Sequence, residues 1–516
     1  MRKYLYFTVF TSGMTTLALE LSASRLIGSV FGTSNLVWAA IIGIILIYLT
    51  LGYYLGGRMA DRSPNYLTMY TILAWGAFFV GLVPFLAKPV LLFAANAFDG
   101  LQIGILAGSF VVVLVLFSIP VTLLGMISPF AIRLSIKDPG KSGVASGKIY
   151  AISTLGSFLG TFLPVLLLIP LVGTTKTFLI FSHFLLIVAI IGLILSSGLK
   201  KALPYIFLIG ILLVLAITID ISTLKRTTGQ IFEQESGYNY IQVLERDGYF
   251  YLRLNEGQGV HSIYKSGEYD FGGPWQQFLV APFFNENTNP RDVKRIAIIG
   301  LAAGTVARQA AKVFPEVIID GYELDPQIIS VGMEYFGMNL PNLNIFIEDG
   351  RIGLKRSPYQ YELIGVDAYR PPYIPWHMTS IEFFQIVFDH LSDEGALAIN
   401  VGRAPGDRRL IEGLYSTISQ IFPSVYIMDI PGTFNSIIYA TRNPTTKEGL
   451  NENMVLFSTD SAIDQLLTTS MYYAWINLQP NPASRIVYTD DKAPIEWITN
   501  DMVLKYILFG QKDPFQ

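Results

Sequence analysis

Three carboxylates in the second half of the chain follow predicted β-strands. Glu323 comes late in VIIDGYELDP, Asp349 in NIFIEDGR and Asp367 in ELIGVDAY. The carboxyl ends of parallel strands share one edge of a sheet, and open α/β sheets bind their ligands there. One such carboxylate alone is as often a helix cap or a turn residue. Three in succession indicate a binding site.

A turn of small residues precedes these carboxylates in RIAIIGLAAGTVARQAAKVF. The segment predicts a buried strand at 296–299, a turn at Gly300, Ala302 and Gly304, and a helix from about Thr305. Small side chains let the backbone approach a ligand closely, and the first amides of the helix point toward it. The turn is the candidate cofactor-binding loop.

The spacing of the acidic residues favours a nucleoside as the ligand. Glu323 lies about 20 residues beyond the turn, where a carboxylate can accept hydrogen bonds from both ribose hydroxyls. Asp349 is placed to accept from an adenine amino group. We therefore predict a nucleoside site at one edge of a parallel sheet.

The elements that must position this site form an α/β domain behind a small β region. A helix at about 379–391 and the strand GALAIN continue the alternation of helices and strands. The earlier segment YNYIQVLERDGYFYLRL alternates apolar and polar residues around Asp247 and Gly248, which predicts a β-hairpin. We expect a small β domain at 221–290 and a Rossmann-like, doubly wound α/β domain at 291–516.

The first 220 residues have the composition of a membrane-embedded helical bundle. The chain of 516 residues is 52% hydrophobic and only 15% charged, with a mean hydropathy of +0.46. A bilayer span needs roughly 20 apolar residues. About seven stretches meet this need: 5–28, 37–57, 67–87, 103–130, 149–172, 177–197 and 203–219. The first is expected to be retained rather than cleaved as a signal peptide.

The positive charges of the connections predict a multi-pass cell-membrane protein with a cytoplasmic N-terminus. Lys and Arg gather on alternate connections, and cytoplasmic loops carry an excess of both. Seven crossings would then leave the α/β domain outside, away from cytosolic nucleosides. One explanation is that the number of spans is wrong by one, in which case segment 84–95 or the last short run is the segment in doubt. The other is that the α/β domain does lie outside. The sequence leaves its side open.

Composition excludes several classes of partner. A net charge of −3 without a basic stripe argues against nucleic acid. The absence of cysteine removes disulfides and thiolate metal sites, and we expect no metal.

In the predicted helical bundle, the charged residues Glu20 and Arg25 either have a function or simply form an ion pair with each other. Gly156 and Gly160 favour tight helix packing.

The chain resembles the spermidine synthase (polyamine aminopropyltransferase) family, in particular its membrane-fused bacterial branch. The resemblance rests on LALELSASRLIGSVFG, LGYYLGGRMADR, GKIYAISTLGSFLGT, ESGYNYIQV, LRLNEGQGVHS, GGPWQQF, TSIEFF and TDDKAPIEW, together with the strands above. It implies a transferase of polyamine biosynthesis, which moves an aminopropyl group from decarboxylated S-adenosylmethionine to a small amine. It leaves a homo-oligomer open.

The resemblance also implies roles for individual residues. Glu323 matches the ribose ligand, Asp349 the adenine ligand, and Asp367 the acidic residue that opens the catalytic loop. Asp367 is the candidate for deprotonating the attacking amine. Candidate substrate-binding residues are Tyr238 and Tyr369 as aromatic walls, Asn239 in place of a usual Gln, and His261, which is also a candidate base.

Departures from the family pattern concern the recognition of amines. Ala303 stands where an aspartate usually holds the amino group of the donor, and Arg370 stands where a second aspartate usually binds the acceptor. GGPWQQF replaces a Tyr-His-Glu segment. An amine pocket needs carboxylates to balance its charge. Residues that could substitute are Glu256, Glu268, Asp270 and Glu382, which the sequence alone does not place in the pocket.

Two other functions therefore stay open. The first is a methyltransferase that uses S-adenosylmethionine, because Ala303 removes the group that reads the free aminopropyl end and Arg370 could face a donor carboxylate. The second is a non-catalytic transporter or sensor that binds a nucleoside or a polyamine. The lipid bilayer is a partner in each case.

Overall fold

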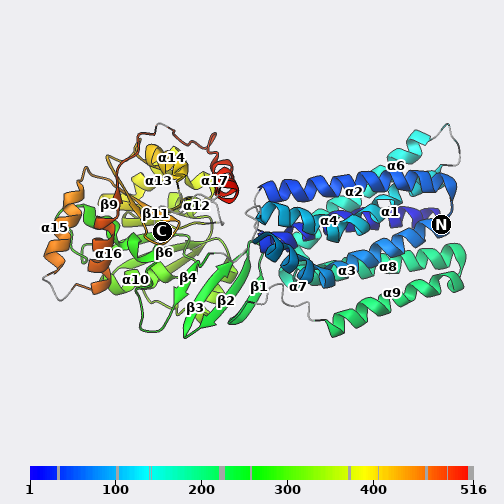
Figure 1. Cartoon of the computed structure of the whole chain (residues 1–516), viewed down its shortest axis with the longest axis horizontal. Helices are drawn as coiled ribbons and strands as arrows, with labels where there is room; N and C mark the ends of the chain where they lie inside the picture. The colour runs from blue at the N-terminus through cyan, green and yellow to red at the C-terminus, as the bar shows by residue number, and fades with distance from the viewer. Residues whose placement is uncertain are drawn as a thin grey trace. The chain divides into compact units, whose positions relative to one another are not determined.

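The computed structural model forms two compact units (Figure 1). It describes residues 1–31, 35–99, 104–136, 138, 140, 142–219, 227–255, 259–369, 374–404, 406–458, 463–484 and 486–509. The helical unit comprises residues 1–227 and 233–240, and the α/β unit comprises residues 228–232 and 241–516.

Long helices make up the first unit. They are α1 (Arg2–Phe31), α2 (Asn35–Arg62), α3 (Tyr66–Asp99), α4 (Gly104–Gly125), α5 (Ile127–Ser135), α6 (Ser142–Leu163), a π-helical turn (Pro164–Leu168), α7 (Ile169–Val172), α8 (Thr174–Ser197) and α9 (Leu199–Thr218). Helix α3 continues through Pro84 and Pro89. Segment 84–95, one suspect for a wrong span count, therefore belongs to this single helix.

Six helices in the described part of the chain are long and apolar enough to cross a membrane. They are Val37–Arg62, Tyr66–Leu91, Ser109–Ser135, Ser142–Val172, Thr174–Ser197 and Leu199–Thr218. The predicted count of seven is not confirmed. The remaining stretch, 5–28, is helical within α1, but it buries polar side chains such as Thr8, Thr11 and Thr15. These hydroxyl groups make α1 less apolar than the other long helices.

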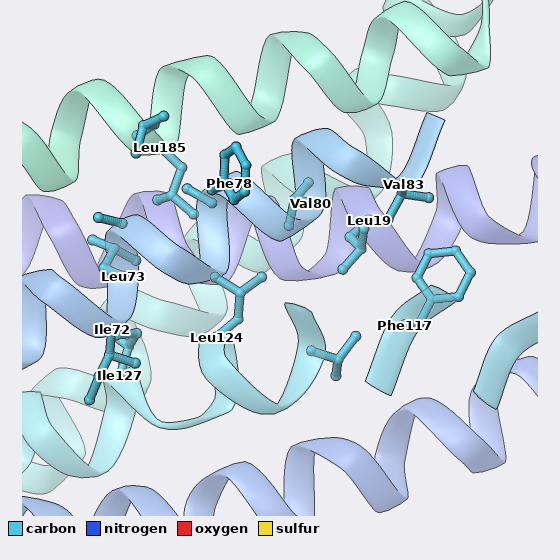
Figure 2. Packing of buried hydrophobic residues seen from close by; sticks show 14 of the residues in the cluster. Leu19, Ile72, Leu73, Phe78, Val80, Val83, Phe117, Leu124, Ile127 and Leu185 are labelled. Carbon is cyan, nitrogen blue, oxygen red and sulfur yellow. The ribbon is translucent and has the colours of Figure 1, made fainter. Parts of the chain in front are cut away.

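The core of the helical unit lies between α1, α3, α4 and α8. Figure 2 shows Leu19 of α1, Phe78 of α3, Phe117 of α4 and Leu185 of α8 among its buried side chains. Lipid supplies no hydrophobic drive between spanning helices, so close backbone contact matters more there than in water.

Glycines allow α1 and α6 to touch through their backbones. A Cβ atom at Gly156 would lie 2.0 Å from the carbonyl oxygen of Phe10, and one at Gly160 would lie 2.0 Å from that of Met14. Both distances are far inside van der Waals contact. The tight packing predicted for these two glycines is confirmed.

A four-stranded sheet comes next along the chain, with its strands in sequence order. They are β1 (Gln230–Glu235), β2 (Tyr240–Arg246), β3 (Tyr249–Leu254) and β4 (Ser262–Tyr264). Strands β2 and β3 pair antiparallel, so that Arg246 faces Tyr249 across the turn. Asp247 and Gly248 have φ values of 53° and 78°, which two-residue hairpin turns require. The predicted hairpin is confirmed.

The main sheet of the α/β unit has eight strands in the order β12-β10-β11-β9-β8-β5-β6-β7. The strands are β5 (Arg295–Ile299), β6 (Ile318–Glu323), β7 (Leu343–Ile347), β8 (Tyr361–Val366), β9 (Leu391–Gly402), β10 (Ser424–Asp429), β11 (Asn435–Thr441) and β12 (Leu478–Gln479). Strands β9, β8, β5, β6 and β7 run parallel, and β11, β10 and β12 are antiparallel to their neighbours. The strand order reverses between β5 and β8.

Helices cover both faces of this sheet (Figure 1). They are α10 (Thr305–Val313), α11 (Pro326–Tyr335), α12 (Gly350–Arg356), α13 (Ile381–His390), α14 (Arg409–Ile418), α15 (Lys447–Ser458), α16 (Gln465–Ile476) and α17 (Ile495–Phe509), with 3-10 turns η3 (Trp275–Phe284) and η4 (Trp376–Met378). Successive residues of a strand point to opposite faces. Ile296 and Ile298 pack toward η3 and α16, while Ala297 and Ile299 pack toward α13 and α14. This double burial explains the continuous apolar run that predicted β5.

Candidate functional site

The predicted site residues of the α/β unit gather where the strand order reverses. Gly300 follows β5 and Asp367 follows β8, and the backbone N–H of Asp367 donates to the carbonyl of Ile299 at 2.8 Å. Gly300 has a φ of +86°, and a Cβ there would lie 2.5 Å from the carbonyl oxygen of Asp367. Only glycine permits both features. The turn and the candidate catalytic carboxylate are therefore held together by the backbone.

Glu323 closes the turn from the end of β6. Its Oε2 accepts from the N–H of Ala302 at 3.0 Å, and its Oε1 accepts from the N–H of Asp325 at 3.1 Å. An ionised carboxylate offers about four acceptor positions, and the backbone groups of Ala302, Asp325 and Leu324 do not use all of them. Glu323 therefore keeps acceptor capacity for a ligand hydroxyl. Burial raises the pKa of Glu323, and the backbone donors oppose that rise.

The turn rests on side chains that sequence reasoning did not identify. Ser262 Oγ accepts from the N–H of Ala303 at 3.0 Å. Arg308 is buried and donates to the carbonyls of Ala303 at 2.7 Å and Ile263 at 2.9 Å. Burial lowers the pKa of Arg308 to about 10. Strand β4 is thereby joined to the turn, an arrangement that no local pattern in the sequence signals.

Ala303 itself is fully buried. Its methyl group packs in an apolar cluster with Val331 and Phe336, and Gly332 approaches it closely. The side chain faces a core rather than a ligand. A carboxylate is absent at this position, and the packing leaves no polar group in its place.

Gly304 and Ala302 complete the turn. Gly304 begins α10 with a φ of +78°, and Ala302 has a φ of +48°. A Cβ on Gly304 would lie 2.6 Å from the side chain of Met338. The three small residues predicted for this loop thus share a backbone conformation that larger side chains disfavour.

Asp349 begins α12 just beyond β7. Its Oδ1 accepts from the N–H groups of Arg351 at 3.0 Å and Ile352 at 3.1 Å, which makes it the helix cap. Its Oδ2 accepts from Nε2 of His377 at 2.9 Å. These hydrogen bonds lower the pKa of Asp349, and the bond to His377 contributes most to the lowering. Asp349 can therefore cap the helix and also bind a ligand, because one acceptor position on Oδ2 remains.

Among the residues that the structure describes, the side-chain partner of Asp367 is an amide. Asn400, near the end of β9, donates from Nδ2 to Oδ1 of Asp367 at 2.9 Å. The protein surrounding Asp367 raises its pKa to about 6, and the bond to Asn400 opposes the rise. At neutral pH the carboxylate is ionised yet close to its pKa, which suits a general base.

Tyr369 lies two residues beyond Asp367, with its ring beside Gly402 at the end of β9. Its hydroxyl is buried, and burial raises the pKa of this phenol. The tyrosine therefore stays neutral near Asp367. The structure brings together Gly300, Asp367 and Tyr369 at one edge of the sheet.

His261 lies just before β4. Its Nε2 is buried and has no hydrogen-bond partner among the residues that the structure describes. Burial lowers the pKa of His261 to about 4. The imidazole is neutral at physiological pH, and Ser262, its neighbour, is the residue that contacts the turn.

Tyr238 and Asn239 fall in segment 233–240 of the helical unit. Tyr238 is exposed, and the backbone N–H groups of both residues donate to Ser236 Oγ, at 3.0 Å and 2.8 Å.

The carboxylates that could replace the missing acidic residues of the amine pocket have other partners. Glu268 pairs with Lys265, Asp270 accepts from Gln276 at 2.8 Å, and Glu382 accepts from the backbone N–H of Asp490 at 3.0 Å. Arg370 and Glu256 lie outside the described residues. In the described part of the chain, no cluster of three or more His, Asp or Glu side chains could hold a metal ion.

Asn400 and His377 are the polar neighbours of the acidic residues that the sequence did not reveal. Neither is close in sequence to the carboxylate that it contacts, and only the fold brings them to Asp367 and Asp349. The one available signal was position, because Asn400 ends the strand GALAIN at the same edge as Asp367.

Sequence comparison gives relatives that match part of the chain. A probable polyamine aminopropyl transferase of Bifidobacterium longum is 30% identical over 284 residues, which cover 52% of this chain and 62% of that protein. A polyamine aminopropyltransferase of Vibrio vulnificus is 28% identical over 212 residues, 39% of this chain and 68% of that one. The chain thus spans less than two thirds of the first of these relatives.

Among solved structures, a probable spermidine synthase from Corynebacterium glutamicum is 17% identical, with a TM-score of 0.39. The match covers 46% of this chain and 89% of that one. No protein-family profile matches the chain.

Proposed function

We propose, from the premise that this chain belongs to the spermidine synthase family, that it is a membrane-anchored aminopropyltransferase. The donor would be decarboxylated S-adenosylmethionine and the acceptor a polyamine or a related amine. The observation that carries the proposal is the grouping of Gly300, Glu323 and Asp367 at the reversal of strand order.

The residues present fit a nucleoside donor. Glu323 keeps acceptor capacity for a ribose hydroxyl, and Asp349 keeps one acceptor position for the adenine amino group. The glycine turn lets the backbone approach the ligand without a side chain between them. The donor supplies the sulfonium that makes its aminopropyl carbon open to attack.

Asp367 would orient and deprotonate the acceptor. The amine nitrogen attacks the aminopropyl carbon bonded to sulfur, a carbon–nitrogen bond forms, and the carbon–sulfur bond breaks. The electron pair of that bond stays on sulfur, which leaves as the neutral thioether 5′-methylthioadenosine. The proton of the amine passes to Asp367, whose pKa of about 6 suits it to accept a proton at neutral pH.

One observation favours a second candidate function. The side chain of Ala303 is buried in an apolar cluster, so the turn presents no carboxylate to the free amino end of a decarboxylated donor. This supports a methyltransferase that uses S-adenosylmethionine itself. The two functions differ in the donor that the protein binds more tightly.

Calorimetry with both donors distinguishes these functions. The full chain in detergent micelles is titrated with decarboxylated S-adenosylmethionine and then with S-adenosylmethionine. We expect tighter binding of the decarboxylated form and transfer of its aminopropyl group to an amine. Tighter binding of the carboxylated form, with methyl transfer, would establish the second function instead. Glu323→Gln is the control, since it removes acceptor capacity for ribose and should weaken both donors.

The helical unit is proposed as the membrane anchor, with the N-terminus in the cytoplasm. Six helices of sufficient length and apolarity support anchoring, and the distribution of Lys and Arg supports the orientation. Six crossings leave both ends of the chain on one side, and a seventh by α1 separates them. A reporter fused to the C-terminus reads the side of the transferase domain directly.

A further inference from the structure

The imidazole of His377 contacts the carboxylate that is expected to read adenine. His377 Nε2 and Asp349 Oδ2 are 2.9 Å apart, and both side chains are largely shielded, with exposed fractions of 31% and 24%. His377 lies in η4, beyond β8, while Asp349 caps α12 beyond β7. Two separate connections of the sheet therefore meet at this bond.

The backbone around His377 is fixed from several directions. Its carbonyl oxygen accepts from Arg351 Nη1 at 2.7 Å, and Arg351 forms a two-pronged ion pair with Asp490 at 2.7 Å for each bond. Ser380 Oγ donates to the same aspartate at 2.6 Å. These partners hold the backbone of η4 beside α12, at a position from which the imidazole reaches Asp349.

The bond to His377 determines which acceptor position Asp349 offers to a ligand. Both positions on Oδ1 are taken by the N–H groups of Arg351 and Ile352, and His377 takes one on Oδ2. A single position, on Oδ2, remains of about four. The amino group at carbon 6 of adenine is a donor, whereas the oxygen that replaces it in hypoxanthine is an acceptor. A carboxylate fixed in this way accepts from the first and repels the second.

We propose that His377 is a positioning residue that orients the Asp349 carboxylate and so makes the donor site selective for a 6-aminopurine. This inference rests on the proposed function, because it assumes a nucleoside at the carboxyl edge of the sheet. It extends that function by assigning selectivity for the nucleobase to the pair of Asp349 and His377. In this pair the aspartate is expected to contact the ligand and the histidine is not. Arg351 and Asp490 act on this pair through the backbone of η4.

The test compares binding of 5′-methylthioadenosine and 5′-methylthioinosine to the full chain in detergent micelles. The wild-type protein should bind the adenine compound more tightly. His377→Met, which lacks a donor, should reduce that preference about 10-fold, the usual effect of losing one hydrogen bond to a charged group. His377→Gln, which can donate from its amide, should restore much of the preference. His377→Phe replaces the Met variant if the latter does not fold.

The controls distinguish failure of this inference from failure of the proposed function. His390→Met removes a histidine of α13 whose ring contacts the carbonyl of Ile386, and it should leave the preference unchanged. No binding of either nucleoside by the wild type would overturn the proposed function. Wild-type preference for adenine that survives in His377→Met, or an equal loss of affinity for both nucleosides, would overturn the role of His377.

Discussion

The side-chain amide of Asn400 donates a hydrogen bond of 2.9 Å to the carboxylate of Asp367. Two opposing influences act on this carboxylate: the surrounding protein raises its pKa to about 6, and the donor on Asn400 lowers it. A base needs a pKa near the working pH to be both ionised and able to take a proton. The hydrogen bond from Asn400 therefore contributes to setting that balance.

We expect the rate of transfer to depend on the ionisation of Asp367. The value of kcat/KM should rise with pH through about 6 and level off above it, because the ionised carboxylate is the base. Asp367→Asn should lower the rate about 10²- to 10⁴-fold. Steady-state kinetics from pH 5 to 8 measures both, with Asp389→Asn on the exposed face of α13 as the control. An unchanged rate in Asp367→Asn would exclude this residue as the base.

Removal of Asn400 should move the same pH profile. Asn400→Leu deletes the bond that favours the ionised carboxylate, so the pKa of Asp367 rises further. The acid limb of the kcat/KM profile should then shift to higher pH, while the rate on its plateau changes less. A uniform loss of rate at every pH would show that Asn400 acts on packing alone.

The two residues illustrate what the sequence could and could not predict. Strands that are buried on both faces leave a continuous apolar run, and a carboxylate after such a run marks an edge of the sheet. The positions of Glu323, Asp349 and Asp367 at that edge were therefore predictable. The partner of each carboxylate was not, because Asn400 and His377 reach them only through the pairing of β8 with β9 and the path of η4.

The helical unit shows a different limit. Length and apolarity identified its long helices, but α1 mixes apolar residues with Thr and Ser, whose hydroxyls bond to the preceding turn of the helix. Thr8 donates to Tyr4 and Thr16 to Ser12, each at 2.9 Å. A hydroxyl satisfied in this way costs little inside a bundle. Composition alone thus does not decide whether α1 crosses the membrane.

Stability and activity should respond to Asp367 in opposite directions. A carboxyl group whose pKa is higher in the folded than in the unfolded protein favours folding when it is protonated. The folded state is therefore weakened as pH rises from about 4 to above 6, where the ionised group is held away from water. Asp367→Asn should stabilise the protein at pH 7.5 by about 1 to 2 kcal/mol.

Thermal denaturation at two pH values measures this effect. The difference in melting temperature between Asp367→Asn and wild type should shrink as pH falls through about 6 and disappear only below the ordinary pKa of 3.8, where the carboxyl group is protonated in both states. A variant that is less stable than wild type at pH 7.5 would contradict the desolvation of Asp367. The same variant therefore tests the electrostatics independently of any activity.

The contact between α1 and α6 should depend on the absence of a side chain at Gly160. A methyl group there would lie 2.0 Å from the carbonyl oxygen of Met14, so Gly160→Ala must push the two helices apart. Overpacking of this kind typically costs about 1 to 3 kcal/mol. Gly210→Ala in α9 is the matched control, because a Cβ atom at that position meets nothing within 4 Å.

Thermal unfolding of the full chain in detergent distinguishes the two glycines. Alanine is a better helix former than glycine by about 1 kcal/mol, so Gly210→Ala should be neutral or stabilising while Gly160→Ala is destabilising. Equal behaviour of the two variants would mean that α1 and α6 do not touch through their backbones. Because a helix that packs this closely must lie along its partner, the result also tests whether α1 is an integral member of the bundle despite its polar side chains.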